Sequence, residues 1–99
     1  MDLFSDKAAL NEICQKYRIS RLALFGSVLK GTQRVGSDVD LLVVFDDEAK
    51  PTLLDIARIE MDLSHLLGGA KVDLRTAADL SSYFRDDVLA SAELQYAAG

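Results

Sequence analysis

The feature that most constrains how this chain can fold is a pair of carboxylates at the start of its most apolar stretch. Asp38 and Asp40 open a run that continues without another charge through Phe45. Alternate residues of a strand point to opposite faces, so Asp38 and Asp40 share one face with Leu42. The apolar run suits a central strand covered on both sides. Burying two carboxylates on one face is costly, because each loses water and they repel each other. Stability alone would not place them there.

A divalent cation would neutralise this acidic pair. Residues two apart on a strand have Cα atoms about 6.6 Å apart, so both carboxylates can converge on one metal or bridge two. Oxygen ligands favour Mg²⁺ or Mn²⁺ over zinc. Asp73, in a later short apolar segment, would close the site from a neighbouring strand. An Asp-x-Asp triplet is common by chance, however, and in a loop it would be ordinary turn chemistry.

A glycine-serine turn precedes the acidic pair and suits phosphate. Gly26 permits close approach of the backbone to a ligand, and Ser27 adds a hydroxyl donor. Backbone N–H groups at such a turn favour anions. Lys30 adds a positive charge, and Ser37 lies directly before the carboxylates. We therefore assign Gly26, Ser27, Lys30 and Ser37 to nucleotide binding, although a Gly-Ser dipeptide alone is weak evidence.

The periodicity of apolar residues predicts a small α/β domain. It favours helices over residues 6–17, 51–67 and 77–97, a helical turn over 28–30, and strands over 19–25, 38–45 and 71–76. Pro51 suits the first turn of the second helix, and Gly68-Gly69 would end it. The sheet should have three or four strands. Whether these strands run parallel or mixed does not follow from the pattern.

The composition narrows the classes of protein. The chain has 99 residues, enough for one domain over 1–99, and a net charge of -5, which argues against nucleic acid as a direct partner. No apolar run reaches the length of a membrane span, and the acidic N-terminus does not resemble a secretory signal, so we expect a cytoplasmic protein. The single cysteine, Cys14, is interpreted as an inert, partly buried thiol, and His65 as a solvated or packed helix residue.

At these residues the chain resembles the minimal nucleotidyltransferases, a compact branch of the DNA polymerase β-like superfamily. The resemblance is carried by Phe25-Gly26-Ser27, by the run from Asp38 to Val43, and by Val72-Asp73-Leu74. It implies a nucleotidyltransferase fold with a three- to four-stranded mixed sheet packed with helices. The family often has Arg or an aromatic residue after Gly-Ser and Arg before the next glycine. Here those positions are Val28 and Lys30.

The resemblance also implies a function. Small family members act as antitoxins that transfer AMP from ATP, with Mg²⁺, to a tyrosine of a HEPN-type ribonuclease toxin. By this resemblance Asp38, Asp40 and Asp73 would be catalytic metal ligands, and the protein would form a hetero-oligomer with the toxin. Two alternatives stay open. One is an inactive binding module that neutralises the toxin by covering it. The other is a small-molecule nucleotidyltransferase, although these are normally longer and carry a helical substrate domain.

Overall fold

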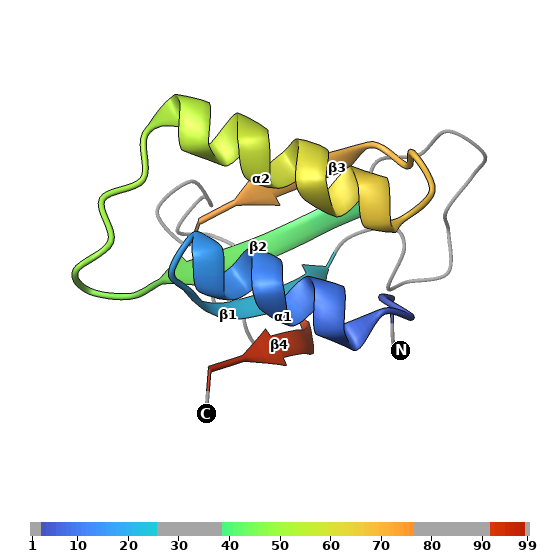
Figure 1. Ribbon diagram of the computed structural model, residues 1–99, viewed down its shortest axis with the longest axis horizontal. Helices are drawn as coiled ribbons and strands as arrows, with labels where there is room; N and C mark the ends of the chain where they lie inside the picture. Colours follow the sequence, from blue (N-terminus) through green and yellow to red (C-terminus); the bar gives the residue numbers. More distant parts are fainter. Residues whose placement is uncertain (1–2, 26–38, 77–91, 99) are drawn as a thin grey trace.

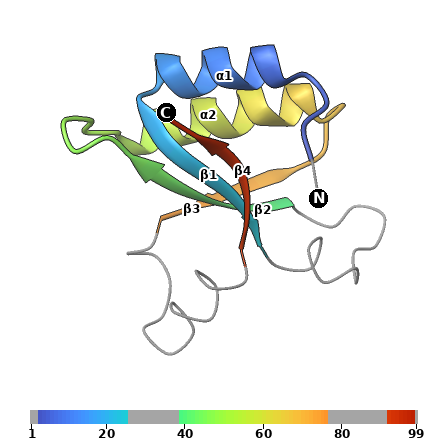
Figure 2. The ribbon, with the colours of Figure 1, turned by 90° about the horizontal axis from the view of Figure 1, so that it is seen from below.

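The computed structural model describes residues 3–25, 39–76 and 92–98 of this protein. The described elements are α1 (Lys7–Lys16), β1 (Ile19–Phe25), β2 (Val39–Phe45), α2 (Leu53–Leu66), β3 (Val72–Arg75) and β4 (Glu93–Ala97). Both helices cover the same face of a four-stranded sheet (Figures 1 and 2). The predicted helical turn over 28–30 lies outside the described residues.

The strand order β3-β2-β1-β4 makes the sheet mixed. β1 runs antiparallel to both of its neighbours, β2 and β4, whereas β2 and β3 are parallel. The parallel step is possible because α2 connects β2 to β3, as a crossover connection requires. The predicted α/β class and mixed sheet are confirmed.

Helix α1 begins where the sequence predicts. The carboxylate of Asp6, at the N-cap, accepts a 3.0 Å hydrogen bond from the N–H of Ala9. One face of the helix buries Leu10 and Cys14 against the sheet. Arg18 has φ of +57° and reverses the chain into β1. The cap and the apolar face together explain why this segment is helical.

Helix α2 starts two residues later than predicted. Thr52 is its N-cap, and its hydroxyl accepts a 3.2 Å hydrogen bond from the N–H of Asp55. The Asp55 carboxylate accepts a 2.9 Å hydrogen bond from the N–H of Thr52, and these bonds lower the pKa of that carboxyl. This capping box fixes the start, so Pro51 lies before the helix rather than in its first turn. Gly68 and Gly69 follow with positive φ, as predicted for the helix end.

The hydrophobic core lies between the helices and the sheet. Its buried members are Phe4, Leu10, Cys14, Ile19, Leu22, Leu24, Val39, Leu41, Val43, Ile59, Leu63, Val72 and Leu74. In β2 the odd-numbered residues through Val43 face this core. The opposite face carries Asp40, Leu42 and Val44, and Leu42 is also buried there. The strand is thus covered on both faces over part of its length, as its apolar run predicts.

The prediction of a helix continuing to residue 97 is wrong at its end, because Glu93–Ala97 forms β4. Residues 77–91 lie outside the described part. In β4 the polar residues Glu93 and Gln95 alternate with Leu94 and Tyr96, a pattern of period two. Its backbone pairs with the side of β1 that β2 leaves open. Pairing with an available sheet edge therefore outweighed the helix propensity of the segment.

Across residues 3–25, 39–76 and 92–98, the structure contains no helix with the length and apolar character needed to cross a bilayer.

Candidate functional site

Two of the predicted site residues, Asp40 and Asp73, fall within the described residues. Gly26, Ser27, Lys30, Ser37 and Asp38 lie outside them.

Asp40 and Asp73 occupy paired positions on neighbouring parallel strands. Asp40 on β2 is the register partner of Asp73 on β3, and adjacent strands lie about 4.8 Å apart. Each aspartate is half-buried and sits between residues that face the core, so both carboxylates point to the face opposite the helices. The structure therefore brings together two side chains that are far apart in the sequence.

The end of β1 lies beside this pair. Phe25, the last residue of β1, is the register partner of Asp40. Because β1 and β2 are antiparallel, the C-terminal end of β1 meets the N-terminal end of β2 at one edge of the sheet. The Gly26-Ser27 segment follows Phe25 directly in the sequence. The described part of β1 thus ends next to the position of β2 that carries Asp40.

The described carboxylates suit a divalent metal. Paired aspartates offer oxygen ligands, which Mg²⁺ and Mn²⁺ prefer. Within the described ranges, no group of three or more histidine, cysteine or acidic side chains is close enough to hold a metal. A third protein ligand would therefore have to come from outside these ranges, where the sequence predicts Asp38 for this role. Asp40 and Asp73 fit as two members of such a set.

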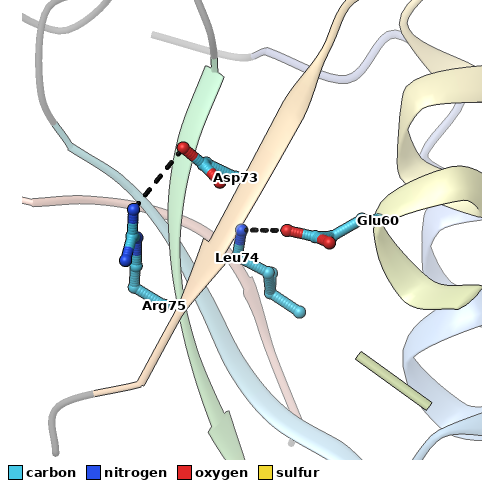
Figure 3. Close-up of polar contacts among 4 residues, drawn as sticks. All are labelled: Glu60, Asp73, Leu74 and Arg75. Carbon is cyan, nitrogen blue, oxygen red and sulfur yellow. Dashed lines mark hydrogen bonds and ion pairs between the residues drawn. The ribbon is translucent and has the colours of Figure 1, made fainter. Parts of the chain in front are cut away.

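Two further residues near Asp73 were missed by the sequence analysis. Arg75 places Nη2 3.6 Å from Oδ2 of Asp73 on the same face of β3 (Figure 3). From the other side, the Glu60 carboxylate on α2 accepts a 2.8 Å hydrogen bond from the N–H of Leu74 (Figure 3). The spacing of two between Asp73 and Arg75 was the available signal, since it puts both side chains on one strand face.

A hollow of about 290 Å³ lies on the face opposite the helices. It is lined by Arg21, Ala23, Leu42, Val44, Ala92 and Leu94. Leu42 is the register partner of both Ala23 and Arg75. The hollow therefore begins two residues along β2 from Asp40, at the next position on the same face. A second cleft, of about 260 Å³, lies near Arg18, Phe45 and Pro51 at the far end of β2. Its position there separates it from the acidic pair.

Cys14 and His65, the only cysteine and the only histidine of the chain, lie on α1 and α2. Cys14 is fully buried, and burial raises the pKa of its thiol to about 12. The thiolate is therefore scarce at neutral pH, which agrees with the predicted inert thiol. His65 is exposed on α2, as expected for a solvated helix residue.

This chain is similar in sequence to a known domain family and to named proteins. The model of a nucleotidyltransferase domain matches residues 7–94. A candidate protein adenylyltransferase of Methanocaldococcus jannaschii is 33% identical over 89 residues, which cover 90% of this chain and 92% of that protein. The protein adenylyltransferase MntA of Thermococcus cleftensis is 35% identical over 78 residues, covering 79% of this chain and 76% of MntA.

Solved structures show the same fold. A candidate minimal nucleotidyltransferase is 40% identical and superposes with a TM-score of 0.69, covering 87% of this chain and 84% of its own. A toxin–antitoxin structure with AMP-PNP superposes with a TM-score of 0.70 at 20% identity, covering 94% of this chain and 74% of its own. At 20% identity, the similarity to the toxin–antitoxin structure supports a shared fold only. With the family model spanning most of the chain, this protein belongs to the nucleotidyltransferase domain family.

Proposed function

We propose that this protein is a protein adenylyltransferase, which transfers AMP from ATP to a hydroxyl group of a partner protein. The observation that carries this proposal is the register pairing of Asp40 with Asp73 on one sheet face, beside the end of β1. Membership of the nucleotidyltransferase family and relatives named as protein adenylyltransferases support the same reaction. Residues 1–99 would act as one minimal nucleotidyltransferase domain.

The proposed site divides the work between two sets of residues. Asp38, Asp40 and Asp73 hold Mg²⁺ or Mn²⁺, and Gly26, Ser27, Lys30 and Ser37 hold the triphosphate of ATP. The metal supplies neutralisation of the charge that develops on the α-phosphate. Asp73 accepts the proton of the acceptor hydroxyl. The hydroxyl oxygen forms a bond to the α-phosphorus, and the bond to the leaving pyrophosphate breaks.

The proposed acceptor is a tyrosine of a HEPN-type ribonuclease toxin, and AMP attachment would silence that toxin. Support comes from the similarity to the protein adenylyltransferase MntA and from the fold shared with the toxin–antitoxin structure that contains AMP-PNP. Asp40 and Asp73 are each partly exposed, so a bound partner would supply a second wall of the site. The protein and its toxin would form a hetero-oligomer in the cytoplasm.

Label transfer from α-labelled ATP tests this proposal. The full chain is co-expressed with its partner, purified with Mg²⁺, and assayed for radiolabel on the partner. We expect labelling by the wild type, loss of about a hundredfold or more in an Asp40→Asn/Asp73→Asn variant, and normal labelling by Asp47→Asn, which alters an exposed loop acid.

The alternative is a binding module that neutralises its toxin without chemistry. It predicts stoichiometric inhibition of the toxin by the Asp40→Asn/Asp73→Asn variant in the absence of ATP. If that variant protects as well as the wild type, and neither transfers label, the enzymatic proposal is wrong.

A further inference from the structure

Arg75 places a cation directly beside the acidic pair. Its Nη2 lies 3.6 Å from Oδ2 of Asp73, and the two side chains are 50% and 33% exposed. In the register of β2 and β3, Asp40 pairs with Asp73 and Leu42 pairs with Arg75. Figure 3 shows the guanidinium and the Asp73 carboxylate on the side of β3 away from Glu60. Arg75 thus lies two residues along β3 from Asp73, at the next position on the face that carries both carboxylates.

The ion pair between Arg75 and Asp73 contributes too little to the stability of the fold for stability to account for its position. Water screens the attraction within exposed pairs of this kind, so they add little to the free energy of unfolding. A separation of 3.6 Å also exceeds the roughly 2.7–2.9 Å of a charge-assisted hydrogen bond. The guanidinium is therefore not locked in a two-pronged contact with the carboxylate. With five N–H donors, it can bind another anion without a change of the backbone.

We propose that Arg75 is an exchangeable counter-charge of the site: it pairs with Asp73 when ligand is absent and binds a phosphate oxygen of the nucleoside triphosphate when Asp73 turns to the metal. This inference rests on the proposed function, because it needs a metal and a triphosphate at the acidic pair. Its physical basis is charge balance. A carboxylate that gains a metal no longer needs the arginine, and a triphosphate brings new negative charge to the same place.

The exchange predicts opposite effects on two ligands. Without nucleotide, Arg75 repels an incoming cation, so its removal should tighten Mn²⁺ binding about threefold to tenfold, after allowance for solvent screening. With nucleotide, removal deletes a charged contact to phosphate, so the metal–nucleotide complex should bind about tenfold more weakly. A general loss of structure would weaken both ligands, so the opposite signs separate the two explanations.

The test uses the full chain in four forms: wild type, Arg75→Met, Arg75→Lys and Arg58→Met. Arg58 is an exposed residue of α2, so Arg58→Met makes the same change of net charge away from the site. Mn²⁺ affinity is measured by electron paramagnetic resonance, and affinity for Mg²⁺ with AMP-PNP by calorimetry. Arg75→Met should bind Mn²⁺ more tightly and the analogue more weakly. Arg58→Met should match the wild type. Arg75→Lys should keep the Mn²⁺ affinity and lose part of the analogue affinity.

Each result decides the inference. If Arg75→Met binds Mn²⁺ as the wild type does, or more weakly, Arg75 is not a counter-charge of the acidic pair. If Arg75→Met binds AMP-PNP as tightly as the wild type, Arg75 does not transfer to the phosphate. If Arg75→Met does not fold, as judged by its circular dichroism, Arg75→Gln replaces it with the same expectations. A wild type that binds neither Mn²⁺ nor the analogue overturns the proposed function together with this inference. A wild type that binds both, with Arg75→Met indistinguishable from it, overturns the inference alone.

Discussion

The Glu60 carboxylate accepts a 2.8 Å hydrogen bond from the backbone N–H of Leu74. This contact joins α2 to β3, the strand that carries Asp73. The N–H of Leu74 points to Glu60 on α2, and among the described strands β3 has β2 as its only neighbour. Helix α2, which covers the core together with α1, therefore also anchors the strand that carries the candidate metal ligand Asp73.

Replacing Glu60 should loosen this attachment. We expect Glu60→Ala to lower the free energy of unfolding by about 1–2 kcal/mol, because a partly buried N–H loses a charged acceptor. Urea denaturation measures the change. Glu60→Gln keeps an oxygen acceptor and should lose less than half as much. If Glu60→Ala unfolds at the wild-type urea concentration, the contact does not stabilise β3.

Metal binding should stabilise the folded protein. A ligand that binds only the folded state at about a hundred times its dissociation constant adds about 2.7 kcal/mol to the free energy of unfolding. Mn²⁺ should therefore raise the melting temperature of the wild type, and chelation should reverse the rise. Asp40→Asn and Asp73→Asn should lose this response, whereas Asp47→Asn should keep it. An equal rise in all four proteins would point to a metal site elsewhere.

The contact between the two helices should make stability depend on alkaline pH. The Tyr17 hydroxyl donates a 2.9 Å hydrogen bond to Oδ2 of Asp62. Burial raises the pKa of Tyr17 above its usual 10.0, and the bond and negative charge of Asp62 add to the rise. Because the folded pKa is higher, the contribution of Tyr17 is complete below pH 10 and is lost as the pH rises through that higher value.

Tyr17→Phe tests this dependence. At neutral pH the variant should be less stable by about 1 kcal/mol, because the bond to Asp62 is gone. Above pH 10 the difference from the wild type should shrink. Urea denaturation at a series of pH values measures it. A difference that stays constant up to pH 11, or grows, would contradict the assigned cause.

The thiol of Cys14 should be protected in the folded protein. Burial raises the pKa of this thiol to about 12, so the reactive thiolate is scarce and shielded. We expect labelling by Ellman's reagent to be at least about a hundredfold slower in the native protein than in urea. Cys14→Ala is the blank for the assay. Comparable rates in the two conditions would mean that α1 opens readily.

Local patterns predicted much of the fold. The strands over 19–25 and 39–45 follow from runs of aliphatic residues, and α1 from its cap and apolar spacing. Segment 93–97 was misassigned because its conformation depends on the open edge of β1, which only the assembled sheet provides. Local propensity does not contain that information.

The site was predicted only in part for a related reason. The residue types suggested that Asp40 and Asp73 act together, and the register of two parallel strands places them opposite each other. Arg75 and Glu60 were missed because their roles depend on what lies beside β3 in space. An arginine on an exposed strand face and a glutamate on a helix are otherwise ordinary surface residues.

Because β1 and β2 are antiparallel, the candidate site lies at one end of the strand pair and the turn towards α2 lies at the other. One end holds Phe25 and Asp40, while the other holds Ile19, Phe45 and the turn that leads towards α2. Residues 46–50 in that turn lie the full length of β2 from the carboxylates. Insertions, fluorescent labels or affinity tags placed there should leave nucleotide transfer intact. Natural insertions in this turn would likewise change the surface that a partner protein contacts and leave the candidate site unchanged.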